Sequence, residues 1–518
     1  MDTAQPEIAP GLARAWKLAI VSAAALAAFT KLLLAFHTYG TNDVYAWERF
    51  ARWSALFGSR LYSIDLAFNH PPSMIHVLGA LTWLAGTTGI AFPFWLRLPA
   101  ILADAASLWI VSRIFADRLN EPVIRWTLLF LALSPTLILV SGFHGNTDPV
   151  VILFLLMAVW KADSSAASGA AFGAAMCIKI FPLIVLPVFF FNQPNLRRRA
   201  VFLASIAAVM IVCWSPYLFR DPRPILHQVV GYQSIYGHWG LTWIVCQIRS
   251  FPDKWHDAFQ HYGAYVVLAI ITAASFVINR QPTRPTLYAQ TGAALFFFLA
   301  TANGFGVQYI AWLVPWTLGV GLIPVAFFSV ASGLLLFLVY NWWSGGFPWF
   351  LADSNYVGDY AGHLDYFLTA CWVSVVVLAY AAWKWRAKSL PTRRTAVALS
   401  TFAALTLIYP AWNQFRHTDA RTYPPTTDHA ALTSIRAGER AMLSQAYYKM
   451  GRYTDAVVAA RTGIALDPTQ LDAWNSLAQA CIQLGRWDEA RNAADTAIRL
   501  APNDETANAN FTVVQGHR

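Results

Sequence analysis

Apolar segments separated by short polar ones follow one another along the chain from Trp16 to Trp412. A helix needs roughly 20 apolar residues to cross a bilayer, and segments that recur in this way are typical of a polytopic membrane protein. We predict an all-α fold with about thirteen transmembrane helices, at residues 16–36, 94–115, 126–142, 149–161, 166–178, 180–192, 200–218, 262–279, 287–303, 309–322, 323–343, 366–386 and 395–411. The pair between residues 166 and 192 is short, and we expect it to be broken or partly re-entrant.

Clusters of cations between the apolar segments predict the orientation. Cytoplasmic loops carry the excess of Lys and Arg, and a crossing at residues 73–90 would put the cluster of Arg113, Arg118 and Arg125 outside. We therefore predict that residues 73–90 form a juxtamembrane helix on the outer surface and that the N-terminus is cytoplasmic. The first apolar run has no small-residue cleavage site after it, so we expect a retained helix. The Ala-rich, lysine-poor composition favours a bacterial inner membrane.

The composition is typical of a membrane protein and argues against a soluble, nucleic-acid-binding or disulfide-rich protein. Of the 518 residues, 57% are hydrophobic and only 12% are charged, against about 25% charged in soluble domains. The net charge of +10 would raise a nucleic-acid hypothesis in a soluble protein. Here the cations serve as topology signals, so we predict no nucleic-acid partner. The five cysteines show no CxxC or Cys/His spacing, which predicts neither a disulfide framework nor a structural zinc site.

The pattern changes after the last apolar segment. We predict a membrane domain at residues 1–412, a linker at 413–436 and a small helical domain at 437–518. Residues 437–504 repeat with period 34, so that Ala446 matches Ala480. This is the tetratricopeptide pattern, in which small residues let two helices of a hairpin pack closely. By the crossing count, the repeat domain lies on the outer, periplasmic side.

Two polar segments interrupt the apolar pattern and are predicted to face the same outer compartment. The first is Thr41-Asn42-Asp43, and the second is His144-Gly145-Asn146-Thr147-Asp148. Polar groups at a membrane border are costly unless they have a role. We predict that Asp43 and Asp148 meet in one pocket as catalytic residues, with Asp43 taking a proton from a hydroxyl. Each aspartate could instead cap the helix that follows it.

Further polar residues are candidates for ligand binding. We predict that His144, Lys179, Arg220 and His70 bind a donor phosphate, although Lys179 could snorkel towards water and His70 could serve only a turn. We predict that Asn146, Tyr236, His238, Gln308 and Tyr309 bind substrate hydroxyls; an interfacial loop and an aromatic belt are the alternatives. Asp148 and His144 could hold a divalent cation, Mg²⁺ or Mn²⁺, but this is weak as a metal motif.

Taken in order, these elements resemble those of the integral-membrane glycosyltransferases with the C-type fold. The resemblance rests on the first outer acid, on Arg97-Leu98-Pro99 with Asp104, and on the second outer acidic segment after Ser134-Pro135. The elements Lys179-Ile-Phe-Pro182 and Gln308-Tyr309-x-x-Trp312 resemble those of mannosyltransferases that use polyprenyl phosphates, including the catalytic subunit of the first GPI-anchor mannosyltransferase. Position 146 is Asn where the family often has an acid, which weakens the case for a bound metal.

The resemblance implies a function. It predicts an inverting glycosyltransferase that moves a hexose, with mannose favoured, from a polyprenyl-phosphate donor to a lipid, glycan or protein acceptor on the non-cytoplasmic face. Asp43 would be the base. The repeats resemble those of multipass O-mannosyltransferases and could bind a protein acceptor, dock another envelope protein or pack on the membrane domain.

Two other functions stay open at this stage. A lipid-linked oligosaccharide ligase or polymerase is expected to carry key Arg and His residues in a large late outer loop, and residues 344–365 contain no Arg. A transporter or flippase with a repeat module for docking is expected to bury charges at mid-membrane and to show internal symmetry among its helices, which is not evident here.

Overall fold

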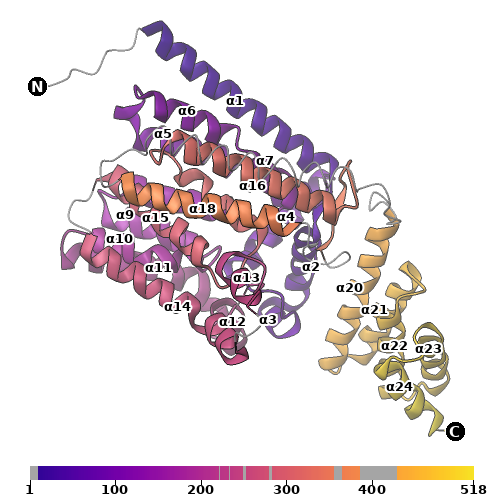
Figure 1. Ribbon diagram of the computed structural model, residues 1–518. Coiled ribbons are helices and arrows are strands. Elements are labelled where there is room, and N and C mark those ends of the chain that lie inside the picture. The colour runs from indigo at the N-terminus through magenta and orange to yellow at the C-terminus, as the bar shows by residue number, and fades with distance from the viewer. Residues whose placement is uncertain are drawn as a thin grey trace, which may run out of the picture. The chain divides into compact units, whose positions relative to one another are not determined.

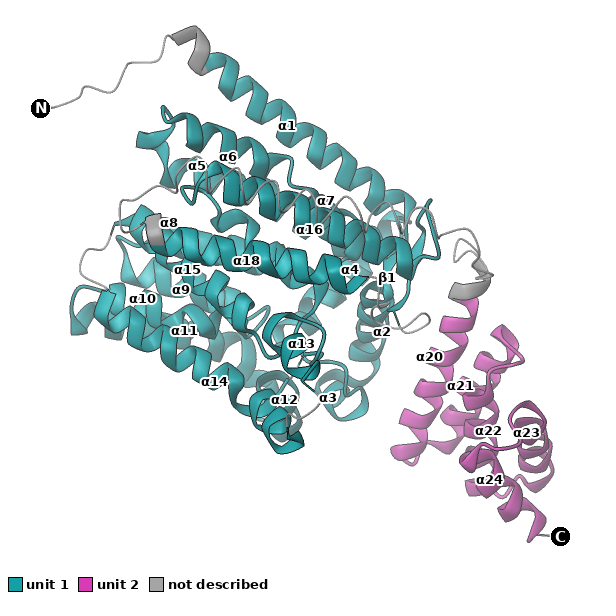
Figure 2. Cartoon of the chain, in the orientation of Figure 1, with its two compact units in different colours: residues 1–422 teal, residues 423–518 magenta. Residues whose placement is uncertain are grey.

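The computed structural model describes residues 10–220, 222–232, 234–248, 252–278, 283–354, 364–385 and 429–517. The chain divides into two compact units, residues 1–422 and 423–518 (Figure 2). The division falls inside the linker predicted at residues 413–436. The crossing predicted at residues 395–411 lies outside the described residues.

The first unit is built almost entirely of helices (Figure 1). In chain order its elements are α1 Pro10–His37, β1 Gly40–Thr41, α2 Asn42–Phe57, η1 Gly58–Arg60, α3 Leu61–Ile64, α4 Ser73–Thr88, α5 Phe92–Ile114, η2 Ala116–Arg118, α6 Pro122–Ala132, α7 Pro135–Leu139, η3 Val140–His144, α8 Asp148–Trp160, α9 Ser165–Met176, η4 Phe181–Val185, α10 Leu186–Asn192, α11 Leu196–Leu218, α12 Pro222–Val230, α13 Gly240–Cys246, α14 Asp253–Ile278, α15 Arg284–Thr301, η5 Val307–Trp312, η6 Val314–Trp316, α16 Leu322–Trp343, β2 Leu351–Ala352 and α18 Asp365–Trp385. The all-α class predicted from the sequence is confirmed.

Several of these helices are suited to a bilayer. Within the described residues, seven are long and apolar enough to cross one, at Arg14–His37, Phe92–Ile114, Pro122–His144, Leu196–Leu218, Asp253–Ile278, Leu322–Trp343 and Asp365–Trp383. The chain is therefore a multi-pass membrane protein. Of the two short crossings predicted between residues 166 and 192, the first corresponds to α9 with 12 residues, and the second is broken into η4 with 5 residues and α10 with 7.

The crossing predicted at residues 309–322 is wrong, and those predicted at 149–161, 166–178, 180–192 and 287–303 are not among the seven helices that are long and apolar enough to cross a bilayer. Residues 309–322 do not form a long helix but the two short 3₁₀ helices η5 and η6. Pro315 lacks the backbone N–H that would continue an α-helix, and Gly319 and Gly321 adopt positive φ angles of 87° and 123°. The apolar composition of this segment reflects burial in the protein interior rather than exposure to lipid.

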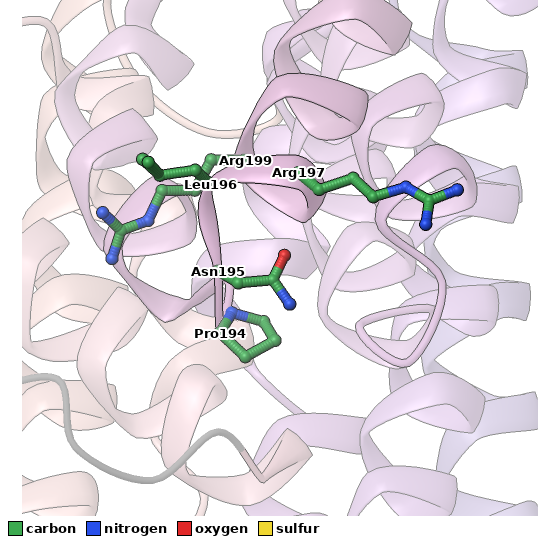
Figure 3. Close-up of a pocket in the computed structure, with 5 residues that line it drawn as sticks. All are labelled: Pro194, Asn195, Leu196, Arg197 and Arg199. Carbon is green, nitrogen blue, oxygen red and sulfur yellow. The ribbon is translucent and has the colours of Figure 1, made fainter.

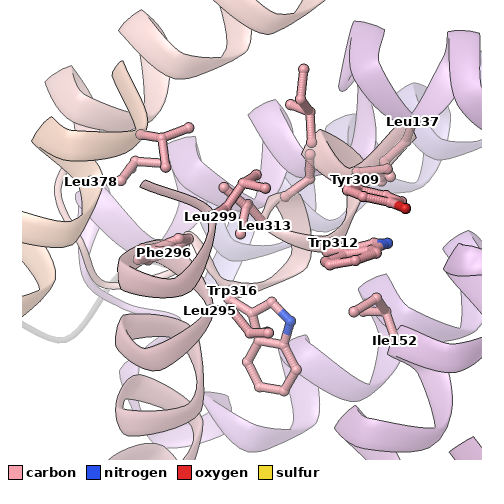
Figure 4. Close-up of a cluster of buried hydrophobic side chains, with 14 of the residues drawn as sticks. Leu137, Ile152, Leu295, Phe296, Leu299, Tyr309, Trp312, Leu313, Trp316 and Leu378 are labelled. Carbon is pink, nitrogen blue, oxygen red and sulfur yellow. The ribbon is translucent and has the colours of Figure 1, made fainter. Parts of the chain in front are cut away.

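The apolar core surrounds these short helices. Figure 4 shows Trp312, Leu313 and Trp316 among side chains of α15, with Leu137 of α7, Ile152 of α8 and Leu378 of α18 nearby. Trp312 also stacks on Phe181 of η4, with ring centroids 3.9 Å apart. This packing holds the 307–316 segment in the interior and so places Gln308 and Tyr309 beside the polar segments described below.

The second unit consists of helical hairpins. Its helices are α20 His429–Lys449, α21 Tyr453–Leu466, α22 Leu471–Gln483, α23 Trp487–Leu500 and α24 Glu505–Gln515. Buried alanines fill the contacts between helices, and Ala456 and Ala490, which are 34 positions apart, are both fully buried. Gly451 and Gly485, also 34 apart, take positive φ angles of 72° and 69° where one helix ends and the next begins.

Candidate functional site

The buried side chain of Arg97 joins the two polar segments. It lies on α5, is fully buried, and donates hydrogen bonds to backbone carbonyls that lie just before each of the two segments. Its Nη2 atom reaches Thr38 O at 2.6 Å and Tyr39 O at 2.9 Å, and Nη1 reaches Gly142 O at 3.0 Å. A planar guanidinium has five donors in a fixed geometry, so it can hold two chain segments in register. Arg97 thus brings the end of α1 and the end of η3 together.

Close backbone packing completes this junction. The hydroxyl of Thr41 donates to His144 O at 2.8 Å, and β1 pairs in parallel with β2. Gly40 has a φ of 110°, and a Cβ atom there would lie 2.7 Å from Phe143 O. Only glycine fits this position without a shift of the backbone. Neighbouring η3 is a π-helical turn closed by the bond from Gly145 N to Val140 O, a local geometry often found at functional sites.

The junction places Asp43 next to His144. Asp43 lies in the first turn of α2, and its Oδ2 atom is 3.0 Å from His144 Nε2 and accepts a hydrogen bond from Asn146 Nδ2 at 3.2 Å. On the other side of the imidazole, Nδ1 lies 2.9 Å from the hydroxyl of Tyr340, on α16. No donor among the described residues reaches Oδ1 of Asp43. Because Thr41 occupies the N-cap position, Asp43 is not the cap of α2.

Asp148 belongs to a second, connected cluster. It begins α8 and is fully buried, and Lys179 Nζ lies 2.7 Å from its Oδ1 atom. Lys179 also donates to Asn146 Oδ1 at 3.1 Å. Asn146 therefore connects the two aspartates, because its amide nitrogen binds Asp43 and its oxygen accepts from Lys179. Lys179 does not simply snorkel towards water, since its ammonium group pairs with a buried carboxylate.

The surroundings of Asp43 favour its ionised form. Burial alone would raise the pKa of this carboxyl group, but the hydrogen bond from His144 and the electrostatic attraction of nearby groups, the ammonium group of Lys179 among them, outweigh it. The net pKa lies below the ordinary value of 3.8. Burial lowers the pKa of His70 well below 6.5, and the charge of Lys179 lowers it further. His70 is therefore neutral at physiological pH, whereas Asp43 is ionised.

A cavity of about 690 Å³ opens in front of these residues. The predicted site residues that line it are Asp43, His70, Asn146, Lys179, Gln308 and Tyr309. Its apolar wall comes from η4, α14 and α15 and includes Ile180, Leu183, Ile184, Leu268 and Phe298. A polar, charged end and an apolar wall thus share one cavity, whose size is typical of small-molecule sites.

The structure places other predicted site residues elsewhere. His144 and Asp148 lie behind the cavity and do not line it, because their polar atoms face Asp43, Tyr340 and Lys179. Arg220 is exposed at the end of α11, and Tyr236 bonds His256 Nδ1 at 3.0 Å. Arg220, Tyr236 and His238 are not among the residues that line the cavity. The structure therefore does not bring these five residues to the wall of the cavity.

A second, open hollow of about 620 Å³ lies at the start of α11. The residues that line it are Pro194, Asn195, Leu196, Arg197 and Arg199. Figure 3 shows the guanidinium groups of Arg197 and Arg199 pointing to opposite sides. Because the two cations do not converge, this hollow is no candidate for the site.

The divalent cation considered from the sequence does not fit this arrangement. Both ring nitrogens of His144 are engaged by Asp43 and Tyr340, and Asp148 pairs with the ammonium group of Lys179. Across the described ranges of the chain, no group of three or more His, Cys, Asp or Glu side chains could hold a metal ion.

Two residues of the site were missed from the sequence. Tyr340 lies in an apolar helix, where one tyrosine carries no pattern of its own. Trp47 packs against His70 with ring centroids 4.1 Å apart, and one tryptophan among many aromatic residues gave no sign of this contact. Arg97 was noted only as part of the Arg97-Leu98-Pro99 motif, and its place in a largely apolar helix was the only sign of burial.

Comparisons with known proteins agree with this picture. Residues 68–227, about a third of the chain, match the model of glycosyltransferase family 87. Residues 441–505 match a tetratricopeptide repeat model. No curated protein sequence matches the chain significantly.

Two solved structures are similar to this chain. The crystal structure of ArnT from Cupriavidus metallidurans bound to undecaprenyl phosphate is 14% identical, with a TM-score of 0.42, covering 82% of this chain and 80% of that chain. The apo structure of the same protein is 17% identical, with a TM-score of 0.38, covering 83% and 80%. The family models thus match two separate parts of the chain, residues 68–227 to glycosyltransferase family 87 and residues 441–505 to tetratricopeptide repeats.

Proposed function

We propose that the membrane unit is an inverting glycosyltransferase that moves a hexose, with mannose favoured, from a polyprenyl-phosphate donor to an acceptor hydroxyl. One observation carries this proposal. An ionised carboxylate and an ammonium group both line one cavity, which also has an apolar wall. Asp43 and Lys179 both line the cavity, and the family 87 match includes Lys179. An acceptor on a lipid, a glycan or a protein fits this chemistry equally well.

Asp43 is the proposed base. Its Oδ2 atom is held by His144 and Asn146, and Oδ1 is available to accept a hydrogen bond from the acceptor hydroxyl. The acceptor oxygen attacks the anomeric carbon from the face opposite the phosphate. The new carbon–oxygen bond forms as the bond from that carbon to the phosphate oxygen breaks, and the hydroxyl proton passes to Asp43. The ordered carboxylate also orients the hydroxyl, which lowers the entropy cost of the attack.

Lys179 is the proposed contact for the departing phosphate. An ammonium group has three donors; that of Lys179 donates to Asn146 and forms an ion pair with Asp148. Because Lys179 also lines the cavity, the same group can donate to a phosphate oxygen of the ligand. Negative charge grows on the phosphate as the bond breaks, so a fixed cation there stabilises the transition state. Asp148, fully buried, holds the ammonium group in place without contacting the ligand.

The apolar wall is the proposed slot for the first isoprene units of the donor. Leu183 and Ile184 of η4 and Leu268 of α14 line the same cavity as Lys179. An isoprenoid chain in this slot would leave water, which stabilises binding by about 25 cal/mol for each Å² of apolar surface buried. The polar end and the apolar wall thus match the two ends of a polyprenyl phosphate.

The test uses the purified full chain in liposomes with undecaprenyl-phosphate [¹⁴C]mannose, and with the glucose-linked donor as a second arm. Membrane extract from a strain lacking the protein supplies acceptors. We expect radiolabel to move to an acceptor, and faster from the mannose donor. Full transfer by Asp43→Asn would overturn the assignment of the base, and no transfer from either donor would overturn the donor class.

We also propose that the site and the repeats face the periplasm of a bacterium and that the repeats dock a protein, either the acceptor or another envelope protein. The matched repeat model supports the docking role, and the cation clusters support the orientation. Alkaline phosphatase fused after Arg518 is expected to be active. A silent fusion, together with an active cytoplasmic reporter at the same position, would reverse the orientation.

A further inference from the structure

The tyrosine behind His144 is not explained by the roles proposed so far. Tyr340 lies near the end of α16, is fully buried, and does not line the cavity. Its hydroxyl group is 2.9 Å from Nδ1 of His144, whose Nε2 is 3.0 Å from Asp43 Oδ2. The three side chains therefore form a continuous line from the membrane-spanning helix to the proposed base.

The positions of the protons in this line follow from the partners. A carboxylate is only an acceptor, so the histidine nitrogen that faces it must carry the hydrogen. A neutral imidazole carries one hydrogen, so Nδ1 is then a bare acceptor. The hydroxyl of Tyr340 donates to it. The opposite tautomer would point the lone pair of Nε2 at the carboxylate of Asp43, which is unfavourable in a buried place.

We propose that Tyr340 is a positioning residue for the transfer reaction, whose hydroxyl group holds His144 in the tautomer with hydrogen on Nε2. In that tautomer His144 binds Oδ2 of Asp43 and turns Oδ1 towards the acceptor hydroxyl. This proposal rests on the proposed role of Asp43. A similar division of labour, in which one group fixes the tautomer that a second group needs, is common around functional histidines.

Packing around Tyr340 supports a fixed orientation. Its ring contacts Phe143 with centroids 5.3 Å apart, Trp343 at 6.0 Å and Trp349 at 6.0 Å. A ring held on several sides loses little further entropy when its hydroxyl binds, so the hydrogen bond can be strong.

The charged and titratable groups that face the Asp43–His144 pair come from several elements. They are Lys179 before η4 and His70 before α4, while Arg97 from α5 is engaged by the backbone carbonyls next to the pair. None of them donates to either ring nitrogen of His144 among the described contacts. Tyr340 is therefore the residue that decides the state of Nδ1.

The first test reads the tautomer directly and needs no substrate. The full chain is labelled with ¹⁵N-histidine, and the spectrum of His144→Gln is subtracted to isolate His144. We expect a protonated Nε2 and a bare Nδ1 at pH 7, and a mixture of the two neutral tautomers in Tyr340→Phe. A ring protonated only on Nδ1 in the wild type, or an unchanged signal in Tyr340→Phe, would overturn the proposal.

The second test reads the reaction, with undecaprenyl-phosphate mannose as donor. We expect Tyr340→Phe to lower kcat about 10- to 100-fold with KM nearly unchanged, since its effect is on a base that contributes about 10²–10⁴. The acid limb of the pH profile should move up by about one unit, because a weaker bond from His144 lets the pKa of Asp43 rise. Tyr288→Phe is the matched control, since Tyr288 is also fully buried and its hydroxyl donates to Pro315 O.

A double variant separates this role from a structural one. If Tyr340 acts through His144, adding Tyr340→Phe to His144→Gln should cost less than twofold in kcat. Independent, multiplying losses would contradict the proposal. If Asp43→Asn keeps full activity, the proposed function fails instead, and the tautomer measurement still decides the arrangement of Tyr340 and His144.

Discussion

The two aspartates of the site have similar local sequences but different surroundings. Each follows an apolar segment, and each lies in the first turn of a helix, Asp43 in α2 and Asp148 in α8. Asp43 keeps a third of its side-chain surface exposed and faces the cavity, whereas the side chain of Asp148 is 1% exposed and pairs with Lys179. Asp43 is therefore placed to contact a ligand, whereas Asp148 is placed to hold Lys179, which itself lines the cavity.

This difference separates a reacting acid from a supporting one. An ionised carboxylate with one open oxygen can take a proton from a ligand. A buried carboxylate beside an ammonium group instead offsets the cost of burying that cation. Identical residue types at similar places along the chain therefore carry different tasks, and only their partners show which is which. The predictions below test that separation, beginning with the largest effect.

Asp43→Asn should lower the rate of transfer by about 10³, because general bases contribute about 10²–10⁴. The shape and volume of the side chain are kept, so the melting temperature should change little. Initial rates with undecaprenyl-phosphate mannose measure the effect. Asp117→Asn, at an exposed position of η2, is the control and should keep wild-type activity. A loss in Asp43→Asn no greater than in this control would remove the distinction.

Asp148→Asn should act through Lys179 and chiefly on stability. Removing one partner of a buried pair leaves the other charge uncompensated, at a cost of about 3–5 kcal/mol. The double variant Asp148→Asn with Lys179→Met removes both charges and should recover much of that stability, while its transfer rate stays about 100-fold low, as for an oxyanion contact. Thermal unfolding in detergent gives the first quantity and initial rates give the second.

The opposite pattern would contradict the supporting role of Asp148. If Asp148→Asn loses activity but keeps its melting temperature, Asp148 takes part in the chemistry. Losses of stability that simply add in the double variant would show that Asp148 and Lys179 are not a pair.

The pH dependence should follow Asp43 alone. Its pKa lies below 3.8, so the carboxylate stays ionised as pH falls and is protonated only when pH passes through that lowered value. Activity should therefore persist down to about pH 4 and fall below it, as expected for a single group. His144→Gln weakens the contact and should move this limb upwards. A limb near pH 6.5 in the wild type would assign the titration to a histidine and contradict the role of Asp43.

Removal of the repeats should have the smallest effect on the site. A chain that ends at residue 428 keeps all the cavity residues, so transfer to a free small acceptor should change less than about twofold, within the range of changes away from the site. Glycosylation in cells should fall if the repeats dock a protein. A large loss with the purified small acceptor would show that the repeats are part of the catalytic unit.

Much of the site was predictable, because its residues break the apolar pattern. Asp43, Asn146, Lys179, His70, Gln308 and Tyr309 were all inferred from polar interruptions, and all line the cavity. The same reasoning also selected Arg220, Tyr236 and His238, which do not line the cavity. A polar residue in an interfacial loop interrupts the apolar pattern in the same way as a residue of the site. It also predicted direct ligand contacts for His144 and Asp148, whose partners come from distant parts of the chain.

By itself, the sequence determined the helical class, the many apolar helices and the 34-residue repeat. These features depend on local composition and on the regular spacing of residues along the chain. The tertiary structure decided which polar groups meet. Arg97 reaches Thr38 and Gly142, and Tyr340 reaches His144 across 196 positions. Such contacts depend on how whole helices pack, and an apolar helix carries no local signal that one hydroxyl group on it will meet an imidazole. For the same reason, the 307–316 segment has the composition of a crossing but is held in the interior by its neighbours.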